Sequence, residues 1–510
     1  MSMKPENTPV IVGVGQINDR TADPAQGLDS LGLMEQALRA AEDDAGGGWL
    51  TGLESIGIVD QISFKNLGNL TEPLAERIGA RPRFARQTDL PSGTSPIELL
   101  NVAANLIGEG KIRSAAICGG EALRTAAKRA AAAAGNASHN VVRARLEAKK
   151  PGYAQGYGLV APIDVYPLYE NAGRSSYGQE LAAAQAETGE IWSRFSEVAR
   201  DNDGAWIREA KTTEEIVTPS PDNRPLAFPY TKLMVANSSV NQGAAFIVTS
   251  LGEARARGIS EDRLIYVGMG AAAHEDDVPL HRDRYDRSAS MTVSLERTLS
   301  LNGLSAGDLD MVELYSCFPC VPKMARRIID WPLDRPATVF GGLTFGGGPI
   351  GNYMSHAVVS MVEQLRHEGR YGLLFANGGF ATHNHSIVLS NRPIDAASFP
   401  QDFDYQADAD AIRDPVPSID ESYVGPATIE TYTVFHARDG EPSGGVIVAR
   451  TEQGHRTLAR VTAEDRAVLD ILLGGAPDVI GHQGFIHQSP DGVQVWRERA
   501  DAVQDPVLTL

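Results

Sequence analysis

The chain has few cysteines, a deficit of basic residues and no long apolar run. Three cysteines in 510 residues are too few for a disulfide framework and are typical of a protein in a reducing compartment. No stretch approaches the roughly 20 consecutive apolar residues of a membrane span. The polar residues 1–9 lack the apolar core of a secretory signal. Together these absences predict a soluble, cytoplasmic protein.

Acidic residues outnumber basic ones by 65 to 46, which gives a formal charge of −19. Such a charge opposes unassisted binding to nucleic acid or to an anionic membrane, although it leaves room for a local basic pocket. Apolar residues make up 42% of the chain, so a large core is expected. The length allows about three or four domains.

One buried helix organises the first third of the chain. Ser95 is expected to cap it, and Glu98 would complete a capping box. Residues 97–107 are apolar nearly all round, which predicts burial on every face. An apolar strand at 112–121 follows and runs into glycines. The turn before this helix is a common setting for a reactive residue, because a helix N-terminus favours negative charge.

This stretch resembles the nucleophile segment of the thiolase superfamily, in which Cys-x-Ser-Gly precedes a central helix and a strand ending in Gly-Gly-x-Glu. Strands and helices alternate from residue 9 onward and do so again from residue 265 to 390. The resemblance covers roughly residues 8–393. It implies an α/β thiolase fold of two pseudo-repeated βαβαβαββ halves in a layered α-β-α-β-α arrangement. It further implies an inserted loop domain and an extra C-terminal OB-like β-barrel.

The resemblance also suggests domain boundaries. The N-terminal half would comprise residues 1–121 and 232–275, with a loop domain at 122–231 inserted between them. A C-terminal half at 276–395, a linker at 396–417 and a barrel at 418–510 would follow. The linker is rich in Pro and Asp, and the segment after it alternates as strands do.

The four reactive positions of thiolases carry other residues here. The family uses a nucleophilic cysteine, a histidine that activates it, a second cysteine that moves the α-proton, and an asparagine in the oxyanion hole. Matched residue by residue, these positions are Gly93, Gly348, Ala376 and Tyr315. The surrounding glycines are retained. The resemblance therefore implies the frame of a thiolase without its catalytic groups, and no ordinary thiolase activity.

Other side chains are candidate substitutes. Ser92 and Thr94 flank the empty position, and His385 follows in a strand that could face the pocket. Cys317 lies in a Cys-Phe-Pro-Cys motif with Cys320, which alone suggests a redox pair or half a zinc site. The alternative is that the histidine is a surface or satisfied core residue. No second Cys-x-x-Cys accompanies the motif.

Candidate ligand-binding residues follow from the same resemblance. Ser238 matches a serine that touches the pantetheine arm of coenzyme A, and it would otherwise be a turn residue. Arg143, Arg145 and Lys149 could bind the phosphates of that ligand, or they form a solvated surface. No tightly bound cofactor is expected; coenzyme A or an acyl-CoA is the expected ligand.

Three functions remain open. The first is a non-thiolytic protein that binds coenzyme A or acyl-CoA. The second is a divergent acetyl-CoA acetyltransferase or other acyltransferase with a different nucleophile, and the third is a non-catalytic scaffold subunit in lipid metabolism. A monomer or a dimer is possible, since Pro91 disturbs the strand through which thiolases dimerise. The barrel could bind a partner protein.

Overall fold

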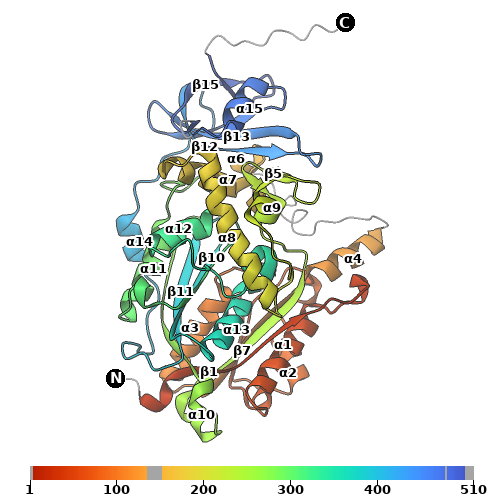
Figure 1. The fold of residues 1–510 in the computed structure, drawn as a ribbon, viewed down its shortest axis with the longest axis vertical. Coiled ribbons are helices and arrows are strands. Elements are labelled where there is room, and N and C mark those ends of the chain that lie inside the picture. The colour runs from red at the N-terminus through yellow and green to blue at the C-terminus, as the bar shows by residue number, and fades with distance from the viewer. Residues whose placement is uncertain (1–3, 135–151, 477–478, 500–510) are drawn as a thin grey trace.

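The computed structural model describes residues 4–134, 152–476 and 479–499 (Figure 1). The first half of the body contains β1 (Pro9–Asn18), α1 (Ser30–Asp44), β2 (Ser55–Ile58), α2 (Thr71–Ile78), β3 (Phe84–Gln87), α3 (Ser95–Gly108), β4 (Ser114–Ala122), β7 (Asn241–Ser250) and α10 (Leu251–Ala256). The second half contains β8 (Ile265–His274), α11 (Ala289–Leu301), β9 (Met311–Leu314), α12 (Cys320–Ile328), α13 (Tyr353–Leu365), β10 (Tyr371–Gly378) and β11 (His383–Ser390).

The strands of the body form a nine-stranded sheet in the order β3-β2-β4-β7-β1-β8-β11-β10-β9. The order β2-β4-β7-β1 in the first half is mirrored by β9-β10-β11-β8 in the second. In both halves the last strand, β7 or β11, runs antiparallel to its two neighbours. The halves meet where Val10 of β1 pairs with Tyr266 of β8. The predicted internal repeat is thereby confirmed.

The helices complete a layered arrangement. The central helix α3 contacts β4 and β7 of the first half and β8 and β11 of the second, and α13 likewise contacts strands of both halves. The outer helix α1 covers β1, β4 and β7, while α11 covers β8 and β11. Packing against strands of both halves explains why α3 is apolar nearly all round. The helix begins at Ser95 with Thr94 as its N-cap and without a side-chain cap bond, so the capping box predicted for Ser95 and Glu98 is wrong.

The segment inserted between the two parts of the first half contains α4 (Leu123–Ala134), α6 (Tyr153–Gly156), α7 (Pro162–Ser176), α8 (Leu181–Asp201), α9 (Thr213–Val217), β5 (Pro225–Ala227) and β6 (Tyr230–Thr231). The C-terminal region contains α14 (Gln406–Ile412), β12 (Gly425–His436), β13 (Pro442–Thr451), β14 (Arg456–Val461), α15 (Arg466–Leu473), β15 (Gln483–Gln488) and β16 (Gln494–Arg497). In the part of the chain that the structure describes, no helix has both the length and the apolar character needed to cross a membrane.

The C-terminal strands form a closed five-stranded barrel. Their order is β13-β14-β16-β15-β12, and the pairing of β12 with β13 closes the ring. The predicted barrel is thus confirmed. The inserted segment is joined to it, because β5 pairs with β12 through Ala227 and Phe435 and α7 packs on β12. Figure 1 shows the barrel at the end of the molecule that also holds α6, α7 and α9.

One buried arginine ties the barrel to the body. Arg456 is fully buried. Its Nη2 is 2.6 Å from Oε1 of Glu430 in the barrel. Its Nη1 donates to the backbone carbonyl of Leu280 and, at 2.6 Å, to that of Arg282, both in the second half. Arg450 also pairs with Glu430, at 2.8 Å, but it is partly exposed and has no hydrogen bond to the body.

We predict that Arg456→Met lowers the free energy of unfolding by about 3 kcal/mol, because it leaves buried carbonyls without a donor and takes a buried partner from the Glu430 carboxylate. Arg450→Met is the matched control and is expected to cost about 1 kcal/mol or less, since its ion pair is partly solvated. Urea unfolding followed by circular dichroism measures both. Equal costs for the two variants would contradict the assigned role of Arg456.

Candidate functional site

The turn before α3 and the ends of β9 and β10 converge on Gly93. A Cβ atom at this position would lie 2.1 Å from the backbone oxygen of Asn377 and 2.6 Å from the hydroxyl oxygen of Tyr315. Such separations are far shorter than any van der Waals contact. The turn at Gly93, the segment after β9 and the end of β10 therefore lie together, as the sequence-based matches would require. The Asn377 oxygen and the Tyr315 ring occupy the space that a side chain at position 93 would need. Ala376, the neighbour of Asn377, is fully buried in β10.

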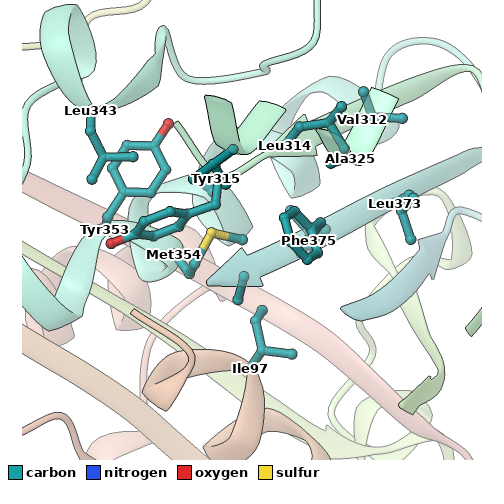
Figure 2. Packing of buried hydrophobic residues seen from close by; sticks show 14 of the residues in the cluster. Ile97, Val312, Leu314, Tyr315, Ala325, Leu343, Tyr353, Met354, Leu373 and Phe375 are labelled. Atoms are coloured by element: carbon teal, nitrogen blue, oxygen red, sulfur yellow. The ribbon is translucent and has the colours of Figure 1, made fainter. Parts of the chain in front are cut away.

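Tyr315 belongs to a buried aromatic group. Its ring meets that of Tyr353 edge to face, with 5.6 Å between centroids, and Figure 2 shows both rings near Met354 and Leu343. The hydroxyl of Tyr353 donates to Glu313 at 2.6 Å. Large, packed side chains therefore surround the position that the resemblance matches to the family's nucleophile.

Glu313 is a buried acid that sequence reasoning missed. Its carboxylate accepts further hydrogen bonds from the Thr338 hydroxyl at 2.8 Å and the Val339 amide at 2.9 Å. Burial raises the pKa of Glu313 to about 7, against the opposing effect of these donors. The available signal was a lone acidic residue within the apolar strand Met-Val-Glu-Leu, since buried carboxylates are rare unless they are partnered.

The hydroxyl candidates are bonded to each other. Ser92 Oγ lies 2.9 Å from Thr94 Oγ1. Thr94 also lines a cavity of about 230 Å³ with His385, Glu98, Asn384 and Phe403. His385 Nε2 lies 2.6 Å from Asn101 Nδ2, and burial lowers the pKa of this imidazole to about 3. His385 is therefore a neutral side chain at physiological pH.

Cys317 is not placed as an activated nucleophile. Burial raises the pKa of its thiol to about 12, while a hydrogen bond with Tyr166 opposes the shift. A thiolate is the reactive form of cysteine, so this thiol is unreactive at neutral pH. Cys317, Cys320 and Cys118 are free of disulfides. Within residues 4–134, 152–476 and 479–499, no group of three or more His, Cys, Asp or Glu side chains is placed to hold a metal ion.

Ser238 lies beside the glycine loop at residues 341–349. The neighbouring Asn237 donates its backbone N–H to Leu343 O at 3.0 Å and accepts from the Gly348 N–H at 2.8 Å. Ser238 is half-buried. Gly348 therefore lies against the segment that the resemblance assigns to pantetheine. The three predicted phosphate ligands, Arg143, Arg145 and Lys149, lie outside the described residues.

Helix α8 covers the same glycine loop. Gly342 has a φ of +68°, and a Cβ atom there would lie 2.4 Å from the ring of Phe195. Trp192 Nε1 donates to Thr344 Oγ1 at 2.9 Å. Close approach of helix and loop explains why glycine is required at this position. The inserted segment thus forms a fixed cover over the loop.

We predict that Gly93→Ala lowers the free energy of unfolding by about 1–3 kcal/mol, because the added methyl group overpacks a filled site. Gly156→Ala is the control, since a Cβ atom there meets nothing within 4 Å. Chemical unfolding of both variants checks the prediction. A Gly93→Ala protein as stable as the wild type would show that position 93 has room for a side chain.

We also predict that His385→Gln weakens the acid sensitivity of the fold. The ordinary pKa near 6.5 is lowered in the folded state, so the unfolded state binds the proton first as the pH falls. This group alone removes about 1.4 kcal/mol of stability per pH unit below that value. Unfolding free energies measured between about pH 6.5 and pH 5 should fall less steeply for His385→Gln than for wild type. If the free energy of unfolding fell equally steeply with pH in wild type and His385→Gln, the assignment of a neutral, buried His385 would be contradicted. His281→Gln, at a half-exposed site, is the control.

Comparison with known proteins agrees with this geometry. The additional C-terminal domain of type 1 thiolase-like proteins matches residues 407–491. The crystal structure of a monomeric SCP2-thiolase like protein type 1 from Mycobacterium smegmatis is similar at 28% identity and a TM-score of 0.79, over 96% of this chain and 99% of that one. No match was found among the curated proteins.

Two enzymes share the fold at lower identity. Human mitochondrial 3-ketoacyl-CoA thiolase, solved in complex with CoA, has 15% identity and a TM-score of 0.57, over 77% of this chain and 100% of that one. Acetyl-CoA acetyltransferase from Syntrophomonas wolfei has 16% identity and a TM-score of 0.55, over 76% and 100%. The chain therefore has a thiolase-like fold, and its C-terminal region matches the additional domain of type 1 thiolase-like proteins.

Proposed function

We propose that this protein binds coenzyme A or an acyl-CoA and does not catalyse the thiolase reaction. The lack of thiolase catalysis is supported by the filled space at Gly93, where an added Cβ atom would lie 2.1 Å from the Asn377 carbonyl oxygen. An acyl group needs both an attacking atom and room beside it. In a serine protease, loss of the nucleophile alone costs roughly 10⁶-fold in rate.

Neighbouring side chains do not replace the missing group at position 93. Cys317 is held as a thiol by burial, and Tyr315 occupies the matched oxyanion position with a buried ring. Gly348 offers no imidazole at the position of the activating histidine. Acyl transfer by the thiolase route would need all of these functions together.

Binding is supported by the parts of the frame that are kept. Asn237 donates its backbone N–H to Leu343 O and accepts from the Gly348 N–H, which holds the Ser238 segment against the glycine loop. Helix α8 covers that loop through Trp192. A rigid segment next to a covered loop is a suitable wall for an extended ligand, because little ordering is needed on binding. The human thiolase of the same fold was solved with CoA.

A second candidate is a divergent acyltransferase. The supporting observation is that Thr94 and His385 line one cavity of about 230 Å³. A neutral imidazole could accept a proton from a hydroxyl group. We rank this candidate lower because the Thr94 hydroxyl is bonded to Ser92 and His385 is bonded to Asn101.

We predict that calorimetry detects coenzyme A binding by the wild-type protein, and that Ser238→Trp weakens it about tenfold or more by filling the pantetheine path. Ser239→Trp is the control, since Ser239 is the exposed neighbour in the same turn. A coupled assay should find no cleavage of acetoacetyl-CoA above background.

Absence of any coenzyme A binding would reject the proposal and favour a scaffold subunit. Cleavage at ordinary enzyme rates would reject its second part. A labelled acyl-CoA that leaves its acyl group on Ser92, Thr94 or Cys317 would establish the divergent acyltransferase instead.

A further inference from the structure

Three arginines from distant parts of the chain gather around Trp206. The guanidinium carbon of Arg20, just after β1, lies 4.6 Å from the centroid of the indole ring, and that of Arg124, in α4, lies 5.5 Å from it. Arg208 follows Trp206 by two residues. Burial, and then the charges of Arg124 and Arg208, lower the pKa of Arg20, which indicates a site of concentrated positive charge.

In the part of the chain that the structure describes, two of these charges lack an acidic partner. Arg20 Nη2 donates to the backbone oxygens of Ala205 at 3.0 Å and Trp206 at 2.6 Å. Within the described ranges, neither Arg20 nor Arg124 forms an ion pair, whereas Arg208 pairs with Asp203 at 2.6 Å. In a chain of formal charge −19, two adjacent arginines without carboxylates are unexpected. Like charges held together favour an anion between or beside them.

Asp19 lies next to Arg20 but does not neutralise it. Its carboxylate accepts from the backbone N–H of Thr21 at 3.1 Å and of Leu28 at 2.6 Å. These bonds hold the acid within its own loop. Among the described residues the Arg20 guanidinium therefore has no carboxylate partner, and only its Nη2 donates to backbone oxygens. Arg20 is exposed and Arg124 is half-buried, so a ligand in solvent can reach the pair.

The cluster lies beside the candidate ligand segment. The backbone N–H of Arg124 bonds to the carbonyl of Val240 at 3.3 Å, two residues from Ser238. The backbone N–H of Trp206 donates to Gly346 O at 2.9 Å, in the glycine loop. These backbone bonds place the segments that carry Arg124 and Trp206 next to the Ser238 segment and the glycine loop.

We propose that Arg20 and Arg124 bind the phosphate groups of a nucleotide, namely those at the nucleotide end of coenzyme A. Identifying the ligand as coenzyme A rests on the proposed function above. Guanidinium groups suit this role because their planar N–H donors match phosphate oxygens and remain charged at all physiological pH values. Trp206 supports both guanidinium groups and keeps them near each other.

The test titrates adenosine 3′,5′-bisphosphate, inorganic pyrophosphate, coenzyme A and pantetheine into wild type and into the Arg20→Gln/Arg124→Gln variant. We expect the variant to bind adenosine bisphosphate and coenzyme A about tenfold or more weakly, with pantetheine unchanged. Added salt should weaken wild-type binding more than variant binding. Preference for adenosine bisphosphate over pyrophosphate would identify a nucleotide rather than free phosphate as the ligand.

Arg335→Gln is the matched control. Arg335 also lies over a tryptophan, at 3.9 Å from the Trp331 centroid, and also donates to two backbone oxygens, those of Leu309 and Asp310. It follows α12 in the chain and contacts the residues just before β9, at the end of that strand away from Tyr315. The control therefore removes the same charge and the same kind of contact elsewhere, and its affinity for adenosine bisphosphate should equal that of wild type.

The outcomes separate the two proposals. Coenzyme A binding that is equal in wild type and the double variant would overturn the arginine site and leave the proposed function intact. Adenosine bisphosphate could bind in an arginine-dependent way while coenzyme A binds no more tightly than it does. That result would support the arginine site and count against the pantetheine path along Ser238. Tighter binding of pyrophosphate than of the nucleotide would overturn the nucleotide assignment.

Discussion

The contact between Gly93 and the opposite half of the molecule is the constraint on which the site depends. The turn that precedes α3 comes from the first half, while Tyr315 and Asn377 come from the second. Because a Cβ atom at position 93 would meet both, only glycine allows the halves to approach this closely. The glycine at position 93 and the large ring of Tyr315 are therefore parts of one packing arrangement. A cysteine at position 93 would require the second half to move, not simply a new thiol.

The glycines of the loop at residues 341–349 are required by packing, whereas catalytic residues are required by chemistry. Gly342 is needed because Phe195 lies where its side chain would be, and this contact depends on α8 covering the loop. Such packing persists whatever chemistry the site performs. A glycine pattern is therefore strong evidence for a fold and weak evidence for an activity. This explains how the chain can share the thiolase frame while its buried interior at Gly93 is occupied by Tyr315 and Tyr353.

The sequence made the frame predictable because its signals are local. Alternation of apolar strands and helices indicated the repeat, and the spacing of glycine turns indicated the family. The contact of Tyr315 with Gly93 was not predictable, since it joins residues far apart in the chain and no local pattern encodes it. The partnership of Glu313 with Tyr353 was missed for the same reason. The capping box failed because Thr94, not Ser95, became the N-cap, and Ser95 Oγ instead accepts from the Ser92 N–H at 3.2 Å.

The barrel is part of the body, not a module on a flexible tether. The segment that leads to it runs along α3: Asn105 bonds twice to the backbone of Gln401, at 2.9 and 2.8 Å, and Phe403 stacks on His385 with 5.1 Å between centroids. Arg456 then fixes the barrel to the second half. Phe403 also lines the cavity at the head of α3. The segment that leads to the barrel therefore contributes directly to the surroundings of the helix that follows the Gly93 turn.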